Sequence, residues 1–134
     1  MSDNLRIGII GGGRIGKVHA INLTTRVAGV DVAAMADPFV NDELKAWAAE
    51  RGISRVLKDY KEILSDGTID AVLICSPTDT HADISKEAAL AGKHVFCEKP
   101  LDQDPDTIRE TIKVVRECGV VFQIGFNRRF DHNF

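Results

Sequence analysis

Three glycines near the start of the chain have the spacing of a loop that binds a dinucleotide. Gly11, Gly13 and Gly16 satisfy G-x-G-x-x-G, directly after the apolar run 5–10 and at the start of a helical pattern. The first glycine permits a tight turn, the second lets a pyrophosphate approach the backbone, and the third lets the helix pack closely on a sheet. The N–H groups at the helix start attract phosphates. The motif therefore predicts a pyrophosphate site.

Two further residues lie inside this glycine loop. Arg14 and Ile15 stand between the second and third glycines, and we include both among the cofactor-binding candidates. The Arg14 side chain could lie against the pyrophosphate, and an exposed side chain is the alternative interpretation.

An acidic residue follows at the end of the next apolar run, 30–36. The Asp37 carboxylate can accept hydrogen bonds from an adenosine ribose, each contributing about 1.5–3 kcal/mol. It would repel a 2′-phosphate, by up to about 4 kcal/mol for a charge pair at about 4 Å and an effective dielectric constant near 20. Both effects favour NAD over NADP. The alternative is that Asp37 caps a helix or loop before Pro38.

A lysine stands at the end of the apolar run 94–97, in "FCEKPLD". If this run is a strand of the same sheet, Lys99 projects into the same crevice, where its ammonium group can polarise a carbonyl or stabilise a forming alkoxide. Pro100 stiffens the backbone beside it. Without further context, a solvated turn is the alternative interpretation.

Polar residues follow the apolar run 71–75 in "SPTDTH". Ligands of doubly wound sheets bind beyond the carboxyl ends of the strands, so these residues are expected to line the nicotinamide side. The loop candidates are Ser76, Pro77, Thr78 and Thr80. His81, in the first helical turn, is a further cofactor-binding candidate and not a catalyst. His19, on the first helix, is interpreted as a packed or hydrogen-bonded histidine.

Short apolar runs alternate with amphipathic helical patterns along the whole chain. The runs predict buried strands at 5–10, 30–36, 54–57, 71–75, 94–97 and 120–124. The helical patterns cover 44–51, 80–91 with a capping Thr or Asp, and a segment that begins around Asp104 and ends before Gly119. This alternation predicts an α/β fold in one domain, with a doubly wound parallel sheet of the Rossmann type.

Composition narrows the class of partner and the compartment. The chain has 134 residues and a net charge of −3, so no basic excess favours nucleic acid or an anionic membrane. We find no signal peptide and expect a cytoplasmic protein. The spacing of Cys75, Cys97 and Cys118 matches no zinc motif, and we assign no metal site.

Five motifs together resemble a known family. "GGGRIGKVH", "ADP", "SPTDTH", "EKPL" and "GFNRRFD" occur in the order and spacing of the N-terminal part of the Gfo/Idh/MocA oxidoreductases, and within that family they most resemble inositol dehydrogenases. The resemblance implies a Rossmann domain that binds NAD(H), with Lys99 working in the active site. It also implies that Glu98 belongs to the motif and orients Lys99 or the nicotinamide edge.

The family pattern continues into a second α/β domain, which supplies much of the polyol pocket, the dimer contacts and an Asp–His acid–base pair. We therefore expect residues 1–124 to form the NAD-binding domain and residues 125–134 to begin the connection to that second domain. The remaining candidate bases are His81, His94 and His132, and none matches the family's catalytic histidine.

Three functions remain open. The first is an NAD-dependent oxidation of a cyclic, inositol-like polyol, for which this chain alone is expected to be weak or inactive. The second is a non-catalytic NAD(H)-binding module or accessory subunit. The third is a related sugar or dihydrodiol oxidoreductase. We also expect the chain to form a homo-oligomer, because a domain that packs against a missing partner exposes apolar surface.

Overall fold

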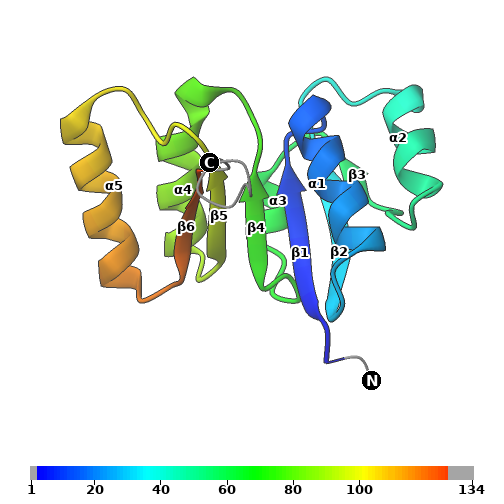
Figure 1. Ribbon diagram of the computed structural model, residues 1–134, viewed down its shortest axis with the longest axis horizontal. Helices are drawn as coiled ribbons and strands as arrows, with labels where there is room; N and C mark the ends of the chain where they lie inside the picture. The colour runs from blue at the N-terminus through cyan, green and yellow to red at the C-terminus, as the bar shows by residue number, and fades with distance from the viewer. Residues whose placement is uncertain (1–2, 127–134) are drawn as a thin grey trace, which may run out of the picture.

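A parallel sheet of six strands forms the centre of the molecule (Figure 1). The computed structural model describes residues 3–126. The strands are β1 (Leu5–Ile10), β2 (Val30–Ala36), β3 (Val56–Leu57), β4 (Ala71–Ile74), β5 (His94–Glu98) and β6 (Phe122–Gly125). They lie in the order β3-β2-β1-β4-β5-β6, and every neighbouring pair is parallel. The predicted doubly wound sheet is confirmed.

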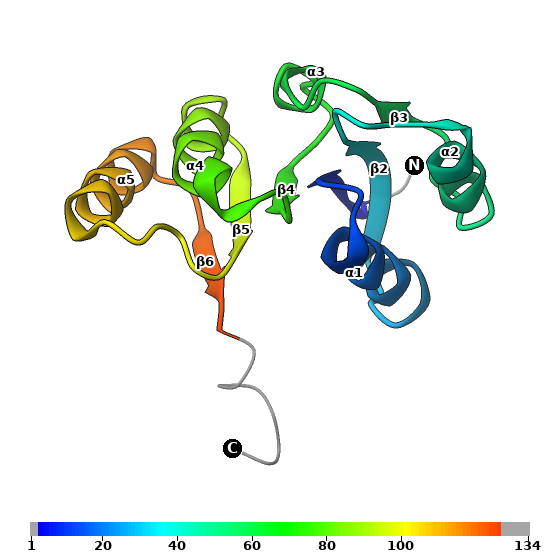
Figure 2. The same cartoon turned by 90° about the horizontal axis from the view of Figure 1, so that it is seen from above.

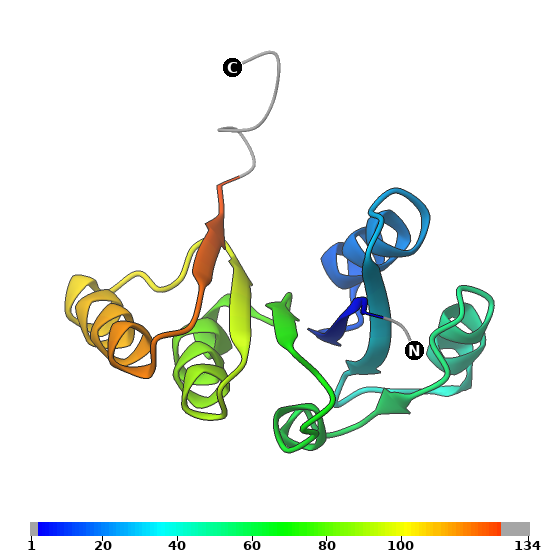
Figure 3. The same cartoon turned by 90° about the horizontal axis from the view of Figure 1, so that it is seen from below.

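Helices cover the two faces of the sheet unequally (Figures 2 and 3). The helices are α1 (Arg14–Thr25), α2 (Asp42–Ala49), α3 (Lys61–Leu64), α4 (His81–Leu90) and α5 (Pro105–Cys118). The first two pack on one face, over a core that contains Ile9, Met35 and Leu44. The other three pack on the opposite face, over a core that contains Ile74 and Ile84. This change of face between β1 and β4 opens a crevice at the carboxyl ends of these strands.

Local signals determine where α2 begins and where α5 begins and ends. The Asn41 side chain accepts a hydrogen bond from the N–H of Leu44 and caps α2. Asp104 caps α5 in the same way, and Gly119 ends it in the left-handed conformation with φ +71°. The prediction that a Thr or Asp side chain caps α4 is wrong. Thr80 stands at the N-cap position, but its hydroxyl donates to the carbonyl of Pro77 and accepts no hydrogen bond from the first N–H groups of the helix.

Some predicted bounds also differ from the structure. The strand predicted at 54–57 is limited to Val56–Leu57, and β6 begins later and ends later than 120–124. The short α3 and a 3-10 turn at Thr78–Thr80 had no clear periodic signal. Arg51 lies beyond the end of α2, although its guanidinium stacks on the Trp47 ring at 4.1 Å. Tertiary packing decides these short elements more than local pattern does.

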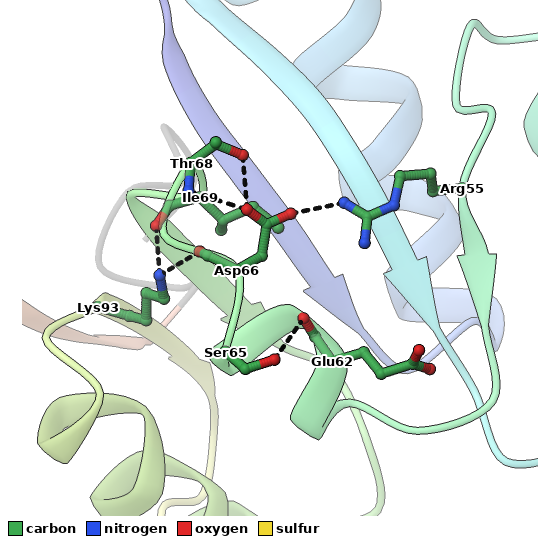
Figure 4. A network of polar contacts seen from close by, with 7 residues as sticks. All are labelled: Arg55, Glu62, Ser65, Asp66, Thr68, Ile69 and Lys93. Atoms are coloured by element: carbon green, nitrogen blue, oxygen red, sulfur yellow. Dashed lines mark hydrogen bonds and ion pairs between the residues drawn. The ribbon is translucent and has the colours of Figure 1, made fainter.

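A polar network fixes the amino-terminal edge of the sheet (Figure 4). The Lys93 ammonium is buried and donates to the carbonyls of Asp66 at 2.6 Å and Ile69 at 2.7 Å. The Asp66 carboxylate accepts from the hydroxyl and N–H of Thr68 and from Arg55. These hydrogen bonds, first those of Thr68 and then that of Arg55, hold the pKa of Asp66 below its usual range. The network fixes the turn that leads into β4.

Residues 3–126 contain neither a membrane-spanning helix nor a cluster of metal-binding side chains. No helix in this range is both long enough and apolar enough to cross a membrane. No group of three or more His, Cys, Asp or Glu side chains in the same range is arranged to hold a metal ion.

Candidate functional site

The glycine loop has the geometry that its sequence predicts. Gly11 has φ +108°, in a region that residues with a side chain rarely adopt. A Cβ atom at Gly16 would lie 1.9 Å from the carbonyl oxygen of Gly11, so the start of α1 touches the loop backbone directly. Only glycine at position 16 permits this approach.

The start of α1 is open to a ligand. Gly13 is the N-cap residue and has no side chain to bond the first N–H groups, and the first turn contains no acidic residue. Apart from the adjacent residues, a Cβ atom at Gly13 would have no heavy atom of residues 3–126 within 4 Å, so the described part of the chain leaves the space before the helix free. Arg14 and Ile15 are exposed beside it. The unpaired N–H groups and the free space fit the pyrophosphate of a dinucleotide.

Asp37 lies beside the glycine loop, at the end of β2. One carboxylate oxygen accepts from the N–H of Gly12 at 2.8 Å, and the other accepts from the N–H of Phe39 at 2.8 Å. Because Asn41 caps α2, Asp37 is not the cap of that helix. A carboxylate oxygen has two lone pairs, so both oxygens retain capacity to accept from a ribose hydroxyl.

A cavity of about 260 Å³ adjoins this carboxylate. Its lining residues are Gly12, Lys17, Asp37, Phe39, Asn41, Glu43 and Leu44. Its position between the glycine loop and α2 fits the adenosine half of a dinucleotide. A larger cavity of about 420 Å³ lies at the amino-terminal edge of the sheet, and no predicted site residue borders it.

The loop after β4 is tied together by its own side chains. The Ser76 and Thr80 hydroxyl oxygens lie 2.7 Å apart, and the Thr80 hydroxyl donates to the carbonyl of Pro77 at 2.6 Å. The His81 ring is only 2% exposed, with Nε2 at 2.7 Å from the Ser76 carbonyl oxygen and Nδ1 at 2.8 Å from that of Pro100. A direct contact between His81 and a cofactor stays a prediction, since both ring nitrogens already face backbone.

The end of β5 connects to α1 through an interaction that sequence reasoning missed. Nε2 of His19 lies 2.6 Å from Oε1 of Glu98, and the His19 ring meets Phe96 edge-on, with centroids 5.4 Å apart. The interpretation of His19 as a hydrogen-bonded residue is confirmed. The signal that could have indicated a contact near the site was the position of His19, three residues after Gly16 on the helix that follows the glycine loop.

Lys99 follows Glu98 directly. It is exposed, and its side chain makes no hydrogen bond or ion pair with any residue of the described range 3–126. The peptide bond between Lys99 and Pro100 is cis. The ammonium group is therefore available to a ligand at the carboxyl edge of the sheet. Its catalytic role stays a prediction.

The other histidines and the cysteines give no further candidate for catalysis within the described residues. His94 begins β5 at the opposite edge, where its Nδ1 accepts from the N–H of Val121, and His132 lies outside the described residues. Burial raises the pKa of the Cys75 and Cys97 thiols to about 12, and Glu98 contributes to both shifts. These thiols stay protonated at neutral pH and are poor nucleophiles.

Comparisons with known proteins agree with this geometry. The model of an oxidoreductase family with an NAD-binding Rossmann fold, GFO_IDH_MocA, matches residues 5–126. Inositol 2-dehydrogenase of Rhizobium meliloti is 45% identical over 97% of this chain and 38% of its own length. The NAD(+)-dependent scyllo-inositol 2-dehydrogenase of Bacillus subtilis is 40% identical over 98% of this chain and 38% of its own length.

A solved structure gives the same result. The scyllo-inositol dehydrogenase of Lactobacillus casei, solved with bound NAD(H) and scyllo-inositol, superposes with a TM-score of 0.89 at 38% identity. The match covers 96% of this chain and 38% of that one. This chain therefore spans about two fifths of the length of the relatives that it matches.

Proposed function

Because this chain belongs to the Gfo/Idh/MocA oxidoreductase family, with its NAD-binding Rossmann fold, we propose that it serves an NAD-dependent dehydrogenase that oxidises a cyclic polyol to a ketone. The substrate class is inositol-like, as in the relatives named above. The carboxyl edge of the sheet carries this proposal. It brings the open start of α1, the Asp37 carboxylate and the free Lys99 ammonium to the same edge, after β1, β2 and β5.

Different segments of this site bind different parts of the cofactor. The N–H groups after Gly13 bind the pyrophosphate, and Asp37 accepts from the adenosine ribose. Its negative charge disfavours the 2′-phosphate of NADP. The loop Ser76–Thr80 borders the nicotinamide. When bound, NAD⁺ accepts a hydride from the carbinol carbon.

Lys99 acts on the substrate oxygen in this mechanism. As the carbinol loses its hydride, its O–H proton must leave, and the ammonium stabilises the developing alkoxide or relays that proton. Glu98, held by His19, fixes the backbone just before Lys99. Proton transfer by a positioned side chain contributes about 10²–10⁴-fold to rate.

Two measurements test the proposal. Calorimetry should show NADH binding, weaker NADPH binding, and similar NADH affinity for K99M, since Lys99 faces the substrate. The complete enzyme should reduce NAD⁺ with myo- or scyllo-inositol, and K99M should lower kcat by about 10²–10⁴-fold. Absence of NADH binding at millimolar concentration contradicts the proposal. Binding without turnover in the complete protein favours a non-catalytic NAD(H)-binding module.

We also propose a homo-oligomer in the cytoplasm. Three apolar side chains on α1 are 39–45% exposed, and they give another copy an apolar surface to contact: Ile15, Val18 and Ile21. The free thiols of Cys75, Cys97 and Cys118 support a reducing compartment. A monomer in light scattering at high concentration would contradict the oligomer.

A further inference from the structure

The residues on both sides of Lys99 are held by histidines from two different helices. Glu98 contacts His19 of α1 at 2.6 Å, and the carbonyl of Pro100 contacts His81 at the start of α4 at 2.8 Å. Lys99 itself is exposed and unbonded within residues 3–126. The backbone that carries the ammonium is therefore fixed from two directions, while the ammonium stays free.

The His81 ring faces two acceptors. Nε2 lies 2.7 Å from the carbonyl oxygen of Ser76, and Nδ1 lies 2.8 Å from that of Pro100. A carbonyl oxygen can only accept, so a ring N–H group must donate in a hydrogen bond to either carbonyl. Neutral imidazole has one N–H group, and either tautomer donates it to one of the two carbonyls while the other nitrogen lies against the second. The ring therefore joins the two segments in either tautomer.

We propose that His81 is a positioning residue that joins the loop Ser76–Thr80 to the Lys99–Pro100 turn. The first segment borders the nicotinamide and the second carries the ammonium, so the ring sets the distance between them. This role rests on the proposed function. It goes beyond the contact with cofactor that the sequence suggested for His81, because the ring acts through backbone on both sides.

Within the described residues, the two carbonyls are the polar groups that contact the His81 ring. The ring is 2% exposed, and no ion pair reaches it within the described residues. The charged residues nearest in the chain are Asp79 and Asp83 on its own segment, and neither bonds to the ring. The Ser76 and Thr80 hydroxyl groups share a hydrogen bond, which joins the two ends of the loop beside the ring.

A shorter polar side chain cannot span the two carbonyls in the same geometry. Asn offers one amide group with donors on one side and an acceptor on the other. In His81→Asn, at least one of the two carbonyls therefore loses its partner, and the loop and the turn are no longer held at a fixed distance.

The ring N–H group provides the first test. In protein labelled with ¹⁵N-histidine, a ¹H–¹⁵N spectrum should show a His81 ring N–H proton that exchanges slowly with water, because the buried ring donates it to a carbonyl. His94 is the internal control, because it is exposed and its Nδ1 accepts from the N–H of Val121. A His81 ring N–H proton that exchanges as fast as that of His94 overturns the proposal. This measurement needs no cofactor, so its result does not depend on the proposed function.

The position of Lys99 provides the second test. Lysines are dimethylated with ¹³C, and the Lys99 signal is identified by its absence from K99R. Saturating NADH should shift this signal in the wild-type chain and in the matched control His94→Asn. In His81→Asn the shift should fall at least about twofold, because the supporting residue is lost.

The outcomes are distinguishable. A full Lys99 shift in His81→Asn overturns the positioning role. A wild-type chain that binds no NADH contradicts the proposed function, and the ring-nitrogen spectrum still decides whether His81 joins the two segments. If His81→Asn fails to fold, that spectrum of the wild-type chain remains decisive.

Discussion

Polar side chains have opposite roles at the two ends of the parallel strands: the amino edge, where the strands begin, and the carboxyl edge, where they end. At the amino edge, Lys93 donates to two carbonyls, Asp66 accepts from Thr68 and Arg55, and Asp70 accepts from the N–H of Arg6 at 2.9 Å. At the carboxyl edge, the first N–H groups of α1 have no side-chain cap, and the Lys99 ammonium has no partner within residues 3–126. The amino edge stabilises the fold, and the carboxyl edge leaves its polar groups for a ligand. Stability and function should therefore respond to different substitutions.

Gly16→Ala should have the largest effect, and it should reduce both stability and NADH binding. The new Cβ atom would meet the Gly11 carbonyl oxygen at 1.9 Å, and backbone at such a close contact must move. We expect a loss of about 3 kcal/mol or more in the free energy of unfolding, together with loss of NADH binding. Urea denaturation measures the first and calorimetry the second. The control is Gly67→Ala, where a Cβ atom has no neighbour within 4 Å. A Gly16→Ala protein as stable as this control would show that the loop tolerates a side chain.

Lys93→Met should affect only stability. The substitution keeps the apolar stem and leaves the buried carbonyls of Asp66 and Ile69 without their donor. We expect the free energy of unfolding to fall by about 2–3 kcal/mol, with unchanged NADH affinity. Lys61→Met, at an exposed position, is the matched control. A large loss of NADH affinity in folded Lys93→Met would mean that the two edges are coupled.

Gly13→Ala should give the opposite result. Apart from the adjacent residues, no heavy atom of residues 3–126 lies within 4 Å of the added Cβ atom, so the free energy of unfolding should fall by no more than about 1 kcal/mol, the usual cost of a poorer N-cap residue. The methyl group would occupy the space before α1 that we assign to the pyrophosphate. We expect NADH affinity to fall about tenfold, equivalent to about 1.4 kcal/mol. Unchanged affinity in calorimetry would move the pyrophosphate site elsewhere.

The smallest expected effect is the change in stability at acidic pH that depends on Asp66. Hydrogen bonds from Thr68 and Arg55 hold the pKa of Asp66 below its ordinary value. The ionised carboxylate therefore stabilises the folded state above about pH 4, and this contribution is lost as the pH falls further. Asp66→Asn should lower the urea midpoint at pH 7 and reduce its dependence on pH between about 5 and 3. An unchanged pH dependence would show that Asp66 does not contribute to acid sensitivity.

The sequence predicted the features that depend on short-range patterns. The glycine spacing, the acid after β2 and the alternation of apolar runs with helical patterns gave the Rossmann architecture and one edge of the site. The caps at Asp104 and Gly119 were also visible, because each acts within a few residues.

Interactions between distant segments were not predictable from such patterns. The His19–Glu98 pair, the bond from His81 to Pro100 and the bonds from Lys93 to the turn before β4 join residues 19 to 79 positions apart. No periodicity or composition signals them, because their partners become neighbours only when the sheet forms. All three partners of His81 and Lys93 named here are backbone carbonyls, which any residue type provides.

The short β3 strand has a consequence for association between chains. It pairs only with Met35 and Ala36, so the first half of β2 has no strand neighbour on that side in the described structure. This open stretch borders the cavity of about 420 Å³, which three guanidinium side chains also line: Arg6, Arg51 and Arg55. Charged side chains along a free edge oppose the addition of a foreign strand. The three arginines therefore disfavour pairing of this open stretch of β2 with a strand of another chain.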